Sequence, residues 1–592
     1  MSKTFELQEQ LKTLPLSNLN DASENFLDWV EPLISKEQFQ TTKANLETFS
    51  SNEGLILEKK LEEWSKKNEG NWLAPLWKNM YLDIREPVAI DVNYFVKLIT
   101  DELKLKYSSC QIAGVIISKL MDIYESILDE SFEPEKIKNT PLCMSAYKEM
   151  FKATKIPKQN RDEYIVKEKT KNSHIIVMYK NHMFKLALND ENAKRYSSKI
   201  ITNTLENLLT SQIKENDTSV GIITTAYRDE AAVLLEQIVE IEENSENFET
   251  LKDALFIVCM DENSKSLYEF AMSLIASNEN NRYFDKNLQL IFNQNGDFGF
   301  NLEHTGSDAG SWINVINMVY EDITNTSIMA SHIENNSKEI IEVKKLDWEI
   351  SIELKKQLDD LRAKHIKKTK DLHQEILYFK DFGSNEIKEM GYSPDAFLQL
   401  ALQLAQYRKF GTLKSTYEAV TTRIYLNGRT ECSRPISMEL LEFVKAFDNE
   451  DSNKSTLKDL MSDACKKQSR RIKDCLRSNG VERYFFAMKN MYTLFGEELG
   501  LKEMPEFFND VGYNKLTYSY ISTSRIESKY FDLGGFGPVV PDGFGFWYNL
   551  IDDRIDMNLI SRKSVNGDNI KSFSDAIVKA INDLAKFAEN KG

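Results

Sequence analysis

The sequence holds six histidines, and one of them, His304, stands where a histidine could do acid–base chemistry. The apolar stretch LQLIFN, an Asn-Gly-Asp turn at residues 295–297 and the stretch FGFNLE precede it, which predicts that it follows a strand. Small or polar residues come next, TGSDAGS, so a ligand could approach the ring closely. A neutral imidazole there could serve as a general base, although the same pattern also fits a structural histidine. The other five histidines, expected in turns, at the surface or in a charged helix, are His174, His182, His332, His365 and His373.

The segment around His304, EHTGSDAGSWINVI, resembles the catalytic-histidine motif of the carnitine/choline acyltransferases, in which a Glu-His pair precedes small residues and an acid. Six further segments resemble motifs of that family and occur in the family's order: PLCMSAYKEMFKATKIP, TTAYRDEA, SPDAFLQLALQLAQYR, TYEAVTTRIYLNGRTE, YISTSR and FGPVVPDGFGFWYN. Chance co-occurrence of all seven in one chain is negligible. The resemblance therefore favours the catalytic interpretation of His304.

The resemblance implies a fold of two similar α/β domains, each like chloramphenicol acetyltransferase, with mixed sheets flanked by helices and the active-site tunnel between them. It also implies reversible, direct transfer of an acyl group between coenzyme A and L-carnitine in a ternary complex. No GxSxG elbow or Cys/His motif suggests a covalent intermediate. A medium- or long-chain enzyme of the palmitoyl or octanoyl type is expected. The alternatives are a short-chain carnitine acetyltransferase and a non-catalytic relative that binds acyl-CoA or acylcarnitine.

Three residues receive catalytic roles from the resemblance. His304 is the general base, Ser524 stabilises the oxyanion, and Asp308 supports the surroundings of the histidine. A hydroxyl suits a developing alkoxide because it need carry no charge in the ground state. Without the resemblance, Asp308 could be a carboxylate that only orders its loop, and the Ser-Thr-Ser triplet at residues 522–524 could be solvated.

Four residues match the family's carnitine site: Tyr417, Thr430, Arg483 and Ser522. Carnitine is a zwitterion whose carboxylate needs donors, and an Arg fork is the best of them. In the segment VERYFFAM, carnitine enzymes have Arg where choline acetyltransferase has Asn, so the pattern favours carnitine over choline. The residue-level alternative for Arg483 is a surface position after the Asn-Gly turn at residues 479–480.

The coenzyme A loop, YFKDFGSNEIKEMGYSPDAF, departs from the family pattern. Lys380 occupies the first basic place, but the second falls on Ser384, and an apparent insertion brings Lys388 nearby. Lys388 could replace the missing ammonium, or coenzyme A could bind more weakly. Asp395 and Glu418 match family positions that contact the cofactor, although Asp395 could also be a first-turn acid favoured by the helix dipole.

The acyl-chain length is expected to depend on Gly534. In the family, short-chain enzymes have a bulky residue, typically Met, at this place, whereas medium- and long-chain enzymes have Gly. An open acyl pocket at Gly534 is therefore predicted. The alternative is a glycine that only allows a bulge or a close approach of the backbone.

The elements that must position these residues can be predicted in outline. Residues 1–85 are expected to be helical, residues 86–345 to form an N-terminal domain with the catalytic histidine, and residues 346–592 a C-terminal domain with the carnitine, coenzyme A and acyl-pocket residues. Strands are predicted at HIIVMY, FKLAL, VGIITTA, ALFIVCM, LQLIFN and YISTS. Residues 334–375 are charged and suggest a helical connector, Ser393-Pro394 predicts a helix start, FGPVVPDGFGFWYNL a hairpin, and KSFSDAIVKAINDLAKFA a final amphipathic helix.

Composition supports a globular protein with at least two cores, since 592 residues exceed the size of a single core and 41% are hydrophobic. The net charge of −17 argues against nucleic-acid partners. The six cysteines have no CxxC pair or metal spacing, so reduced, mostly buried thiols are expected. No metal and no permanently bound cofactor is expected, and coenzyme A or acyl-CoA acts as a co-substrate beside L-carnitine.

The first residues, MSKTFELQEQ, show no apolar core of a signal peptide and no Arg-rich presequence, and no apolar run is long enough to span a membrane. A cytoplasmic protein is expected, with a processed mitochondrial matrix form as the alternative. Peripheral membrane contact is left open. A monomer is expected.

Overall fold

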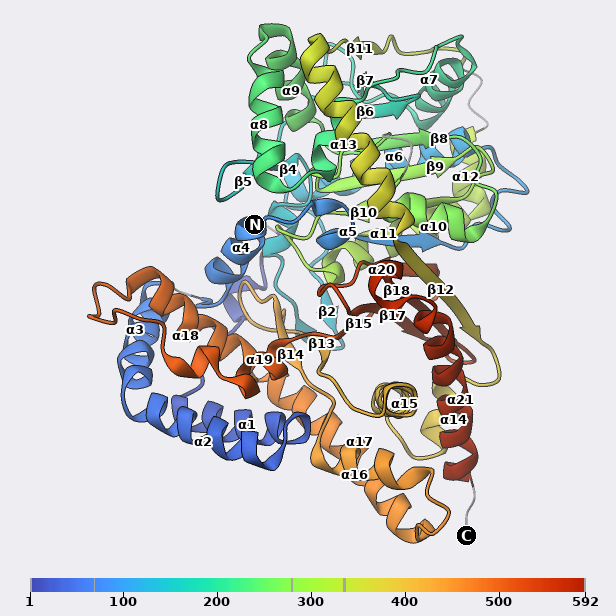
Figure 1. The fold of residues 1–592 in the computed structure, drawn as a ribbon. Helices are drawn as coiled ribbons and strands as arrows, with labels where there is room; N and C mark the ends of the chain where they lie inside the picture. Colours follow the sequence, from blue (N-terminus) through green and yellow to red (C-terminus); the bar gives the residue numbers. More distant parts are fainter. Residues whose placement is uncertain (1–2, 69, 278–280, 334–336, 590–592) are drawn as a thin grey trace.

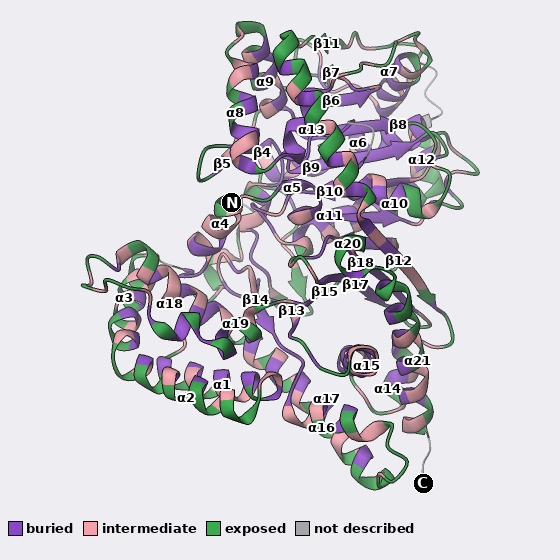
Figure 2. Cartoon of the chain, in the orientation of Figure 1, coloured by how far each residue is buried: buried purple, intermediate pink, exposed green. Residues whose placement is uncertain are grey.

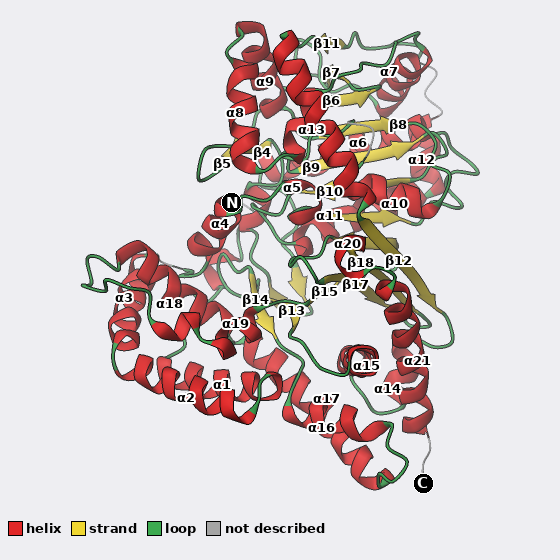
Figure 3. Cartoon of the chain, viewed as in Figure 1, coloured by secondary structure: helices red, strands yellow, loops and turns green. Residues whose placement is uncertain are grey.

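The computed structural model describes residues 3–68, 70–277, 281–333 and 337–589, so residues 334–336 of the expected connector lie outside the described chain. Two mixed sheets with helices packed around them form its frame (Figures 1 and 3). The expected fold class, mixed α/β with two helix-flanked mixed sheets, is confirmed.

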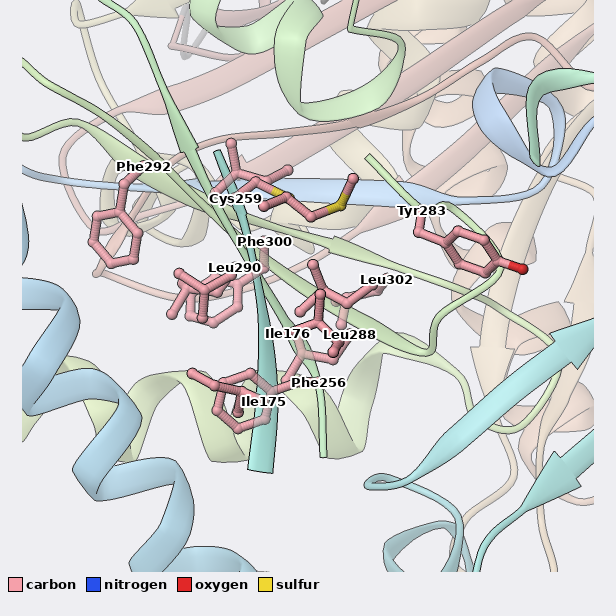
Figure 4. Packing of buried hydrophobic residues seen from close by; sticks show 14 of the residues in the cluster. Ile175, Ile176, Phe256, Cys259, Tyr283, Leu288, Leu290, Phe292, Phe300 and Leu302 are labelled. Carbon is pink, nitrogen blue, oxygen red and sulfur yellow. The ribbon is translucent and has the colours of Figure 1, made fainter. Parts of the chain in front are cut away.

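The larger sheet has eight strands in the order β11-β7-β6-β8-β9-β10-β1-β16. Their bounds are β11 Lys344–Leu346, β7 His182–Ala187, β6 His174–Tyr179, β8 Ile257–Asp261, β9 Leu288–Asn293, β10 Phe298–Leu302, β1 Tyr94–Leu98 and β16 Phe531–Phe536. β6, β8 and β9 run parallel and are buried along their whole length, which explains their continuous apolar runs. Figure 4 shows Ile175, Leu290 and Phe300 in the core that this sheet forms.

Helices cover this sheet: α6 Ser109–Leu128, α7 Ser198–Thr210, α8 Arg228–Val239, α9 Glu242–Asp253, α10 Leu267–Ile275, α11 Ala309–Thr324, α12 Thr326–Ile333 and α13 Ile352–Lys370. The short α5 Val88–Asp91 and the pairs β2 Lys136–Ile137 with β3 Thr140–Pro141 and β4 Ala153–Ile156 with β5 Glu163–Val166 complete this half. α6 starts at a reciprocal capping box between Ser108 and Gln111. Leu354, Leu358 and Leu361 of α13 join the core of the larger sheet, so this core continues past the boundary expected at residue 345.

The smaller sheet has the order β12-β18-β17-β15-β13-β14. Its strands are β12 Leu372–Phe379, β18 Ile555–Arg562, β17 Phe544–Leu550, β15 Ile521–Arg525, β13 Thr416–Thr421 and β14 Thr430–Ser433. Around it lie α14 Ser384–Glu389, α15 Pro394–Phe410, α16 Met438–Phe447, α17 Lys454–Leu476, α20 Lys563–Asn566 and the final amphipathic helix α21 Asn569–Glu589. α15 begins at Pro394 as predicted, although the side chain of the N-cap residue Ser393 makes no capping hydrogen bond.

The N-terminal segment is helical as predicted, with α1 Leu19–Val30, α2 Lys36–Ser51, α3 Glu53–Lys67 and α4 Ala74–Asp83. These helices pack against α18 Glu482–Phe495 and α19 Val511–Thr517, far away in the sequence (Figure 1). A separate apolar cluster that includes Phe26, Phe49, Phe485 and Phe507 holds them there. The beginning of the chain therefore supports the half that contains Arg483.

The segment FGPVVPDGFGFWYNL is not the predicted hairpin. β16 pairs antiparallel with β1 in the larger sheet, whereas β17 lies in the smaller sheet between β15 and β18. The chain thus crosses from one sheet to the other at the Pro-Asp-Gly turn. This crossing fastens the two halves together, and Figure 2 shows that strands of both sheets are largely buried.

Two further local expectations were wrong. VGIITT is a buried 3-10 helix rather than a strand, and the hydroxyls of Thr224 and Thr225 donate to carbonyl oxygens three residues back, both at 2.7 Å. His174 and His365 are buried rather than exposed, and each ring bonds to backbone carbonyls, while His373 lies in the strand β12.

Candidate active site

A cavity of about 2220 Å³ lies between the two sheets and is lined by residues from both halves. It brings together seven of the expected site residues: His304, Asp308, Tyr417, Thr430, Arg483, Ser522 and Ser524. The six expected residues outside its lining are Lys380, Ser384, Lys388, Asp395, Glu418 and Gly534. Within the described chain, no cluster of His, Cys, Asp and Glu side chains could hold a metal ion.

His304 lies two residues after β10, at the strand end that the sequence predicts. Its ring stacks on Tyr81, with centroids 4.9 Å apart and planes 18° apart, and the edge of Tyr94 contacts it at 5.0 Å. Nδ1 is buried and has no hydrogen-bond partner among the described residues, while the side chain as a whole is 26% exposed. Burial lowers the pKa of His304, and the nearby Asp308 carboxylate offsets this only in part. The ring is therefore neutral at physiological pH and can accept a proton.

Asp308 lies before α11, and its Oδ1 is 3.8 Å from His304 Nδ1. Arg429, between β13 and β14, donates to both oxygens of Asp308, from Nε at 2.8 Å and from Nη2 at 3.3 Å. It also donates to the backbone carbonyls of Thr305 and His304, at 2.9 and 3.2 Å. Burial alone would raise the pKa of Asp308, but Arg429 together with His304 and Arg483 outweighs that effect, so the pKa lies below its ordinary value.

Sequence reasoning missed Arg429. It stands in the quoted stretch NGRTE, next to Thr430, but no spacing rule connects it to a histidine 125 residues earlier. In the structure it ties the loop of His304 in one half to the β13–β14 turn in the other. It is thus a positioning residue for the candidate base.

Two buried charged side chains, Glu303 and Lys155, hold the loop around His304. Glu303 accepts hydrogen bonds from the Thr305 backbone and hydroxyl, at 3.0 and 2.5 Å, and lies 3.8 Å from Lys155 Nζ. Lys155 also donates to the carbonyl oxygen of Tyr81 at 2.7 Å. Burial lowers the pKa of Lys155. The same buried group therefore holds both the loop of His304 and the residue on which its ring stacks.

The Ser-Thr-Ser triplet occupies β15, where side chains alternate between the two faces of the sheet. Ser522 and Ser524 line the cavity. The hydroxyl of Thr523 instead donates to the Tyr417 carbonyl at 2.7 Å and accepts from Gln399 at 3.1 Å. The strand therefore presents two hydroxyl groups to the cavity and anchors itself through the third.

Arg483 lies in α18 and is only 4% exposed. Its guanidinium donates to the Tyr417 hydroxyl at 3.0 Å and to the Thr430 carbonyl at 3.1 Å, and lies over the Trp77 ring at 3.8 Å. Burial raises the pKa of Tyr417 to about 12, so its hydroxyl stays protonated. These contacts form a preorganised cationic corner of the cavity, with a hydroxyl beside it, that suits a carboxylate.

The residues expected to bind coenzyme A form a separate group around α14 and α15. Ser384 is the first residue of α14, and Lys388, one turn later, places its Nζ 3.4 Å from Ser384 Oγ. Asp395 accepts a hydrogen bond from the Tyr548 hydroxyl at 2.8 Å. Burial raises the pKa of Glu418, and the neighbouring Asp395 raises it further. Lys380 directly follows β12.

Gly534 does not face open space. A Cβ atom at this position would lie 2.5 Å from Nε1 and 2.7 Å from Cε2 of Trp547, whose indole is fully buried. The open pocket expected at this residue is therefore filled by a side chain from β17. The glycine allows the close approach of a side chain, whereas the alternative interpretation was a bulge or a close approach of the backbone.

All six cysteines are buried, and none is in a disulfide bond. In the described part of the chain, no helix combines the length and the apolar character needed to cross a membrane.

Comparisons with known proteins identify the family of the chain. A model of the choline/carnitine O-acyltransferase family matches residues 14–579. The carnitine O-acetyltransferase of Columba livia is 28% identical over 99% of this chain and 95% of its own, and the mitochondrial carnitine O-acetyltransferase of Saccharomyces cerevisiae is 27% identical over 99% and 89%. The mitochondrial carnitine O-palmitoyltransferase 2 of Rattus norvegicus is 27% identical over 99% and 93%. With a family match along nearly its whole length, the chain belongs to the choline/carnitine O-acyltransferase family.

Proposed function

We propose that the protein transfers acyl groups reversibly between coenzyme A and L-carnitine. One observation supports this above all: the neutral imidazole of His304, the hydroxyls of Ser522 and Ser524 and the buried guanidinium of Arg483 share one cavity. These are the base, the oxyanion donor and the carboxylate partner that the reaction needs.

In the proposed reaction His304 takes the proton of the carnitine hydroxyl. Because Nδ1 is buried, Nε2 is the ring nitrogen assigned to this transfer. The alkoxide attacks the thioester carbonyl carbon, and the Ser524 hydroxyl donates to the oxygen that becomes negative. The carbon–sulfur bond then breaks, and the thiolate of coenzyme A takes the proton from His304. No bond to the enzyme forms at any step.

Recognition of carnitine is assigned to Arg483 with Tyr417, Thr430 and Ser522. A buried cation gains most from a partner that is itself taken out of water, and the carboxylate of carnitine is such a partner. Choline lacks this group, so carnitine is the proposed acceptor.

Binding of coenzyme A is assigned to Lys380, Ser384, Lys388, Asp395 and Glu418. The 3.4 Å separation of Lys388 Nζ and Ser384 Oγ supports the view that Lys388 supplies the ammonium missing at residue 384. If so, Lys388→Gln will raise the KM for acyl-CoA and leave the KM for carnitine unchanged.

Two arms of one assay test the function. Thiol release from acyl-CoA on addition of L-carnitine separates an enzyme from a non-catalytic binding relative. His304→Ala is then expected to lower kcat by several orders of magnitude, since general-base help and alcohol positioning are lost together. A variant with a tenth of the wild-type kcat and an unchanged pH profile would refute the role of His304.

The chain length has two candidate answers. The Leu-Gly-Gly-Phe string favours a palmitoyl- or octanoyl-type enzyme, whereas the indole packed against Gly534 favours a short acyl group. Relatives of both types match the whole chain equally well. The geometry at Gly534 favours the short-chain candidate.

We further propose a cytoplasmic monomer. A processed form in the mitochondrial matrix is the alternative, and two of the relatives are named as mitochondrial. Cell fractionation decides the compartment, and light scattering on the purified protein decides the oligomeric state.

A further inference from the structure

We infer that Trp547 closes the acyl pocket and limits this enzyme to short acyl groups. The inference rests on the proposed carnitine acyltransferase function and deepens it. It assigns specificity to a side chain on β17 that packs directly against Gly534 on β16.

The contact between Gly534 and Trp547 is the first argument. The positions of three indole atoms, Nε1, Cε2 and Cδ1, lie 2.5, 2.7 and 2.9 Å from a Cβ built on Gly534. Real Cβ atoms do not approach other atoms so closely, so any side chain at residue 534 and the present indole exclude each other. The space that the glycine leaves free is therefore the space that the indole fills.

The register of the smaller sheet also supports a position of the indole beside the reacting carbonyl. β15 and β17 are parallel neighbours, and Ser524 lies directly opposite Trp547. Paired residues of neighbouring strands point to the same face, and both line the cavity. A thioester carbonyl bonded to Ser524 would thus have the indole beside it, where the acyl tail must start.

The position next to Gly534 is also occupied by side chains. At Gly535, a Cβ would lie 2.4 Å from Asn558 Nδ2 and 2.7 Å from Phe95 Cε1, so these two side chains close the neighbouring position. Asn558 donates to the Gly534 carbonyl at 2.8 Å and fixes β16 there. The indole, Asn558 and Phe95 therefore fill the space next to residues 534 and 535 of β16.

The indole makes no hydrogen bond to a described residue that would explain a tryptophan at this position. Nε1 of Trp547 is buried without a hydrogen-bond partner among the described residues. Its side chain belongs to the core of the larger sheet, although it stands on a strand of the smaller sheet. Replacing it removes volume and breaks no hydrogen bond.

The test is kcat/KM with acetyl-, octanoyl- and palmitoyl-CoA for the wild type, Trp547→Phe, Trp547→Leu and Trp547→Ala. We expect the wild type to prefer acetyl-CoA. The octanoyl-to-acetyl ratio should rise in the order Phe, Leu, Ala and reach about 100-fold or more over wild type, since each buried CH₂ is worth roughly a factor of four. Trp547→Phe, the mildest change, keeps the test valid if Trp547→Ala does not fold.

A double variant that moves the large side chain from residue 547 to residue 534 gives a more stringent test. In the Trp547→Ala background, Gly534→Met should fill the emptied space and restore the preference for acetyl-CoA. In the wild-type background, Gly534→Met should lower transfer of every chain length, because Met and the indole cannot coexist.

Phe546→Leu is the matched control. Phe546 is buried on the same strand, faces the opposite side and belongs to the core of the smaller sheet. It should lower the melting temperature about as much as Trp547→Leu does and leave the chain-length ratio unchanged.

The possible results distinguish the role of Trp547 from the acyltransferase function itself. A wild type that prefers octanoyl- or palmitoyl-CoA, or a ratio that Trp547→Ala does not change, overturns the role of Trp547 and leaves the acyltransferase intact. Absence of carnitine-dependent thiol release with all three substrates refutes the acyltransferase, and the inference with it.

Discussion

At the scale of single residues, the proposed chemistry of this protein depends on keeping His304 uncharged. Stacking on Tyr81 and contact with Tyr94 remove water from the ring, which favours its neutral form. Asp308 alone would favour the charged form, but Arg429 neutralises much of its effect. The arrangement yields a base that is ready at physiological pH.

The pH profile follows from this. A protonated His304 cannot accept a proton, so kcat/KM must fall as the pH drops through the pKa of the free enzyme. Because burial lowers that pKa, the midpoint of the acidic limb should lie below 6.5, the ordinary value for histidine. A profile of kcat/KM from pH 4.5 to 8 measures it, and a midpoint above 6.5 would contradict the assignment.

The second prediction at this scale concerns Arg483→Asn. The variant should weaken the use of L-carnitine by about 2–4 kcal/mol, the cost of removing one partner from a buried charge pair. Transfer to choline should change much less. The control is Arg470→Asn, since the Arg470 side chain is 79% exposed. Equal losses with both acceptors would count against the carboxylate site.

At the scale of elements, the turn between β13 and β14 acts as a clamp on the loop of His304. It brings Arg429 to Asp308 and to the carbonyls of His304 and Thr305. The turn is tight, because a Cβ on Gly428 would lie 1.9 Å from the Thr422 carbonyl oxygen. That oxygen is backbone and cannot move aside cheaply.

Gly428→Ala is therefore expected to displace the turn and loosen the clamp. We expect a loss of stability of about 1–3 kcal/mol, as for overpacking in general, together with a fall in kcat/KM of about tenfold or more, since small misplacements of a catalytic group are costly. The control is Gly411→Asn, a helix C-cap at φ 70° with open space around it. Melting curves and kinetics on both variants check this, and normal activity in Gly428→Ala would show that the clamp is dispensable.

At the scale of the whole molecule, the two halves are interlocked rather than merely adjacent. β16, from the C-terminal half, is the edge strand of the larger sheet next to β1, and Asp532 bonds there to the buried Lys97 at 2.7 Å. The N-terminal helices in turn pack on α18 and α19. Each half therefore needs a piece of the other to complete its core.

We accordingly predict a single cooperative unfolding transition for the full chain. Separate domains would unfold independently, but here the loss of either half exposes apolar surface of the other. Differential scanning calorimetry provides the measurement. Two well-separated transitions, or a stable, soluble fragment of residues 86–345, would contradict the interlocked description.

The sequence by itself determined those features that depend on local pattern. The apolar runs of β6, β8 and β9 and the start of α15 at Pro394 follow from local pattern and composition. The sequence also predicted that His304 follows a strand. The order of the motifs indicated the family. The same local reasoning failed at Val220–Thr225, where β-branched residues that favour a strand lie in a buried 3-10 helix.

Only the tertiary structure decided the features that join distant residues. Arg429 meets the loop of His304 across 125 positions, β16 leaves its neighbour β17 for the other sheet, and Trp547 fills the space beside Gly534. In each case the partner is chosen by packing, which depends on three-dimensional distance and excluded volume. A glycine in a sequence looks the same whether it opens a pocket or admits an indole, and the difference lies in the strand packed against it.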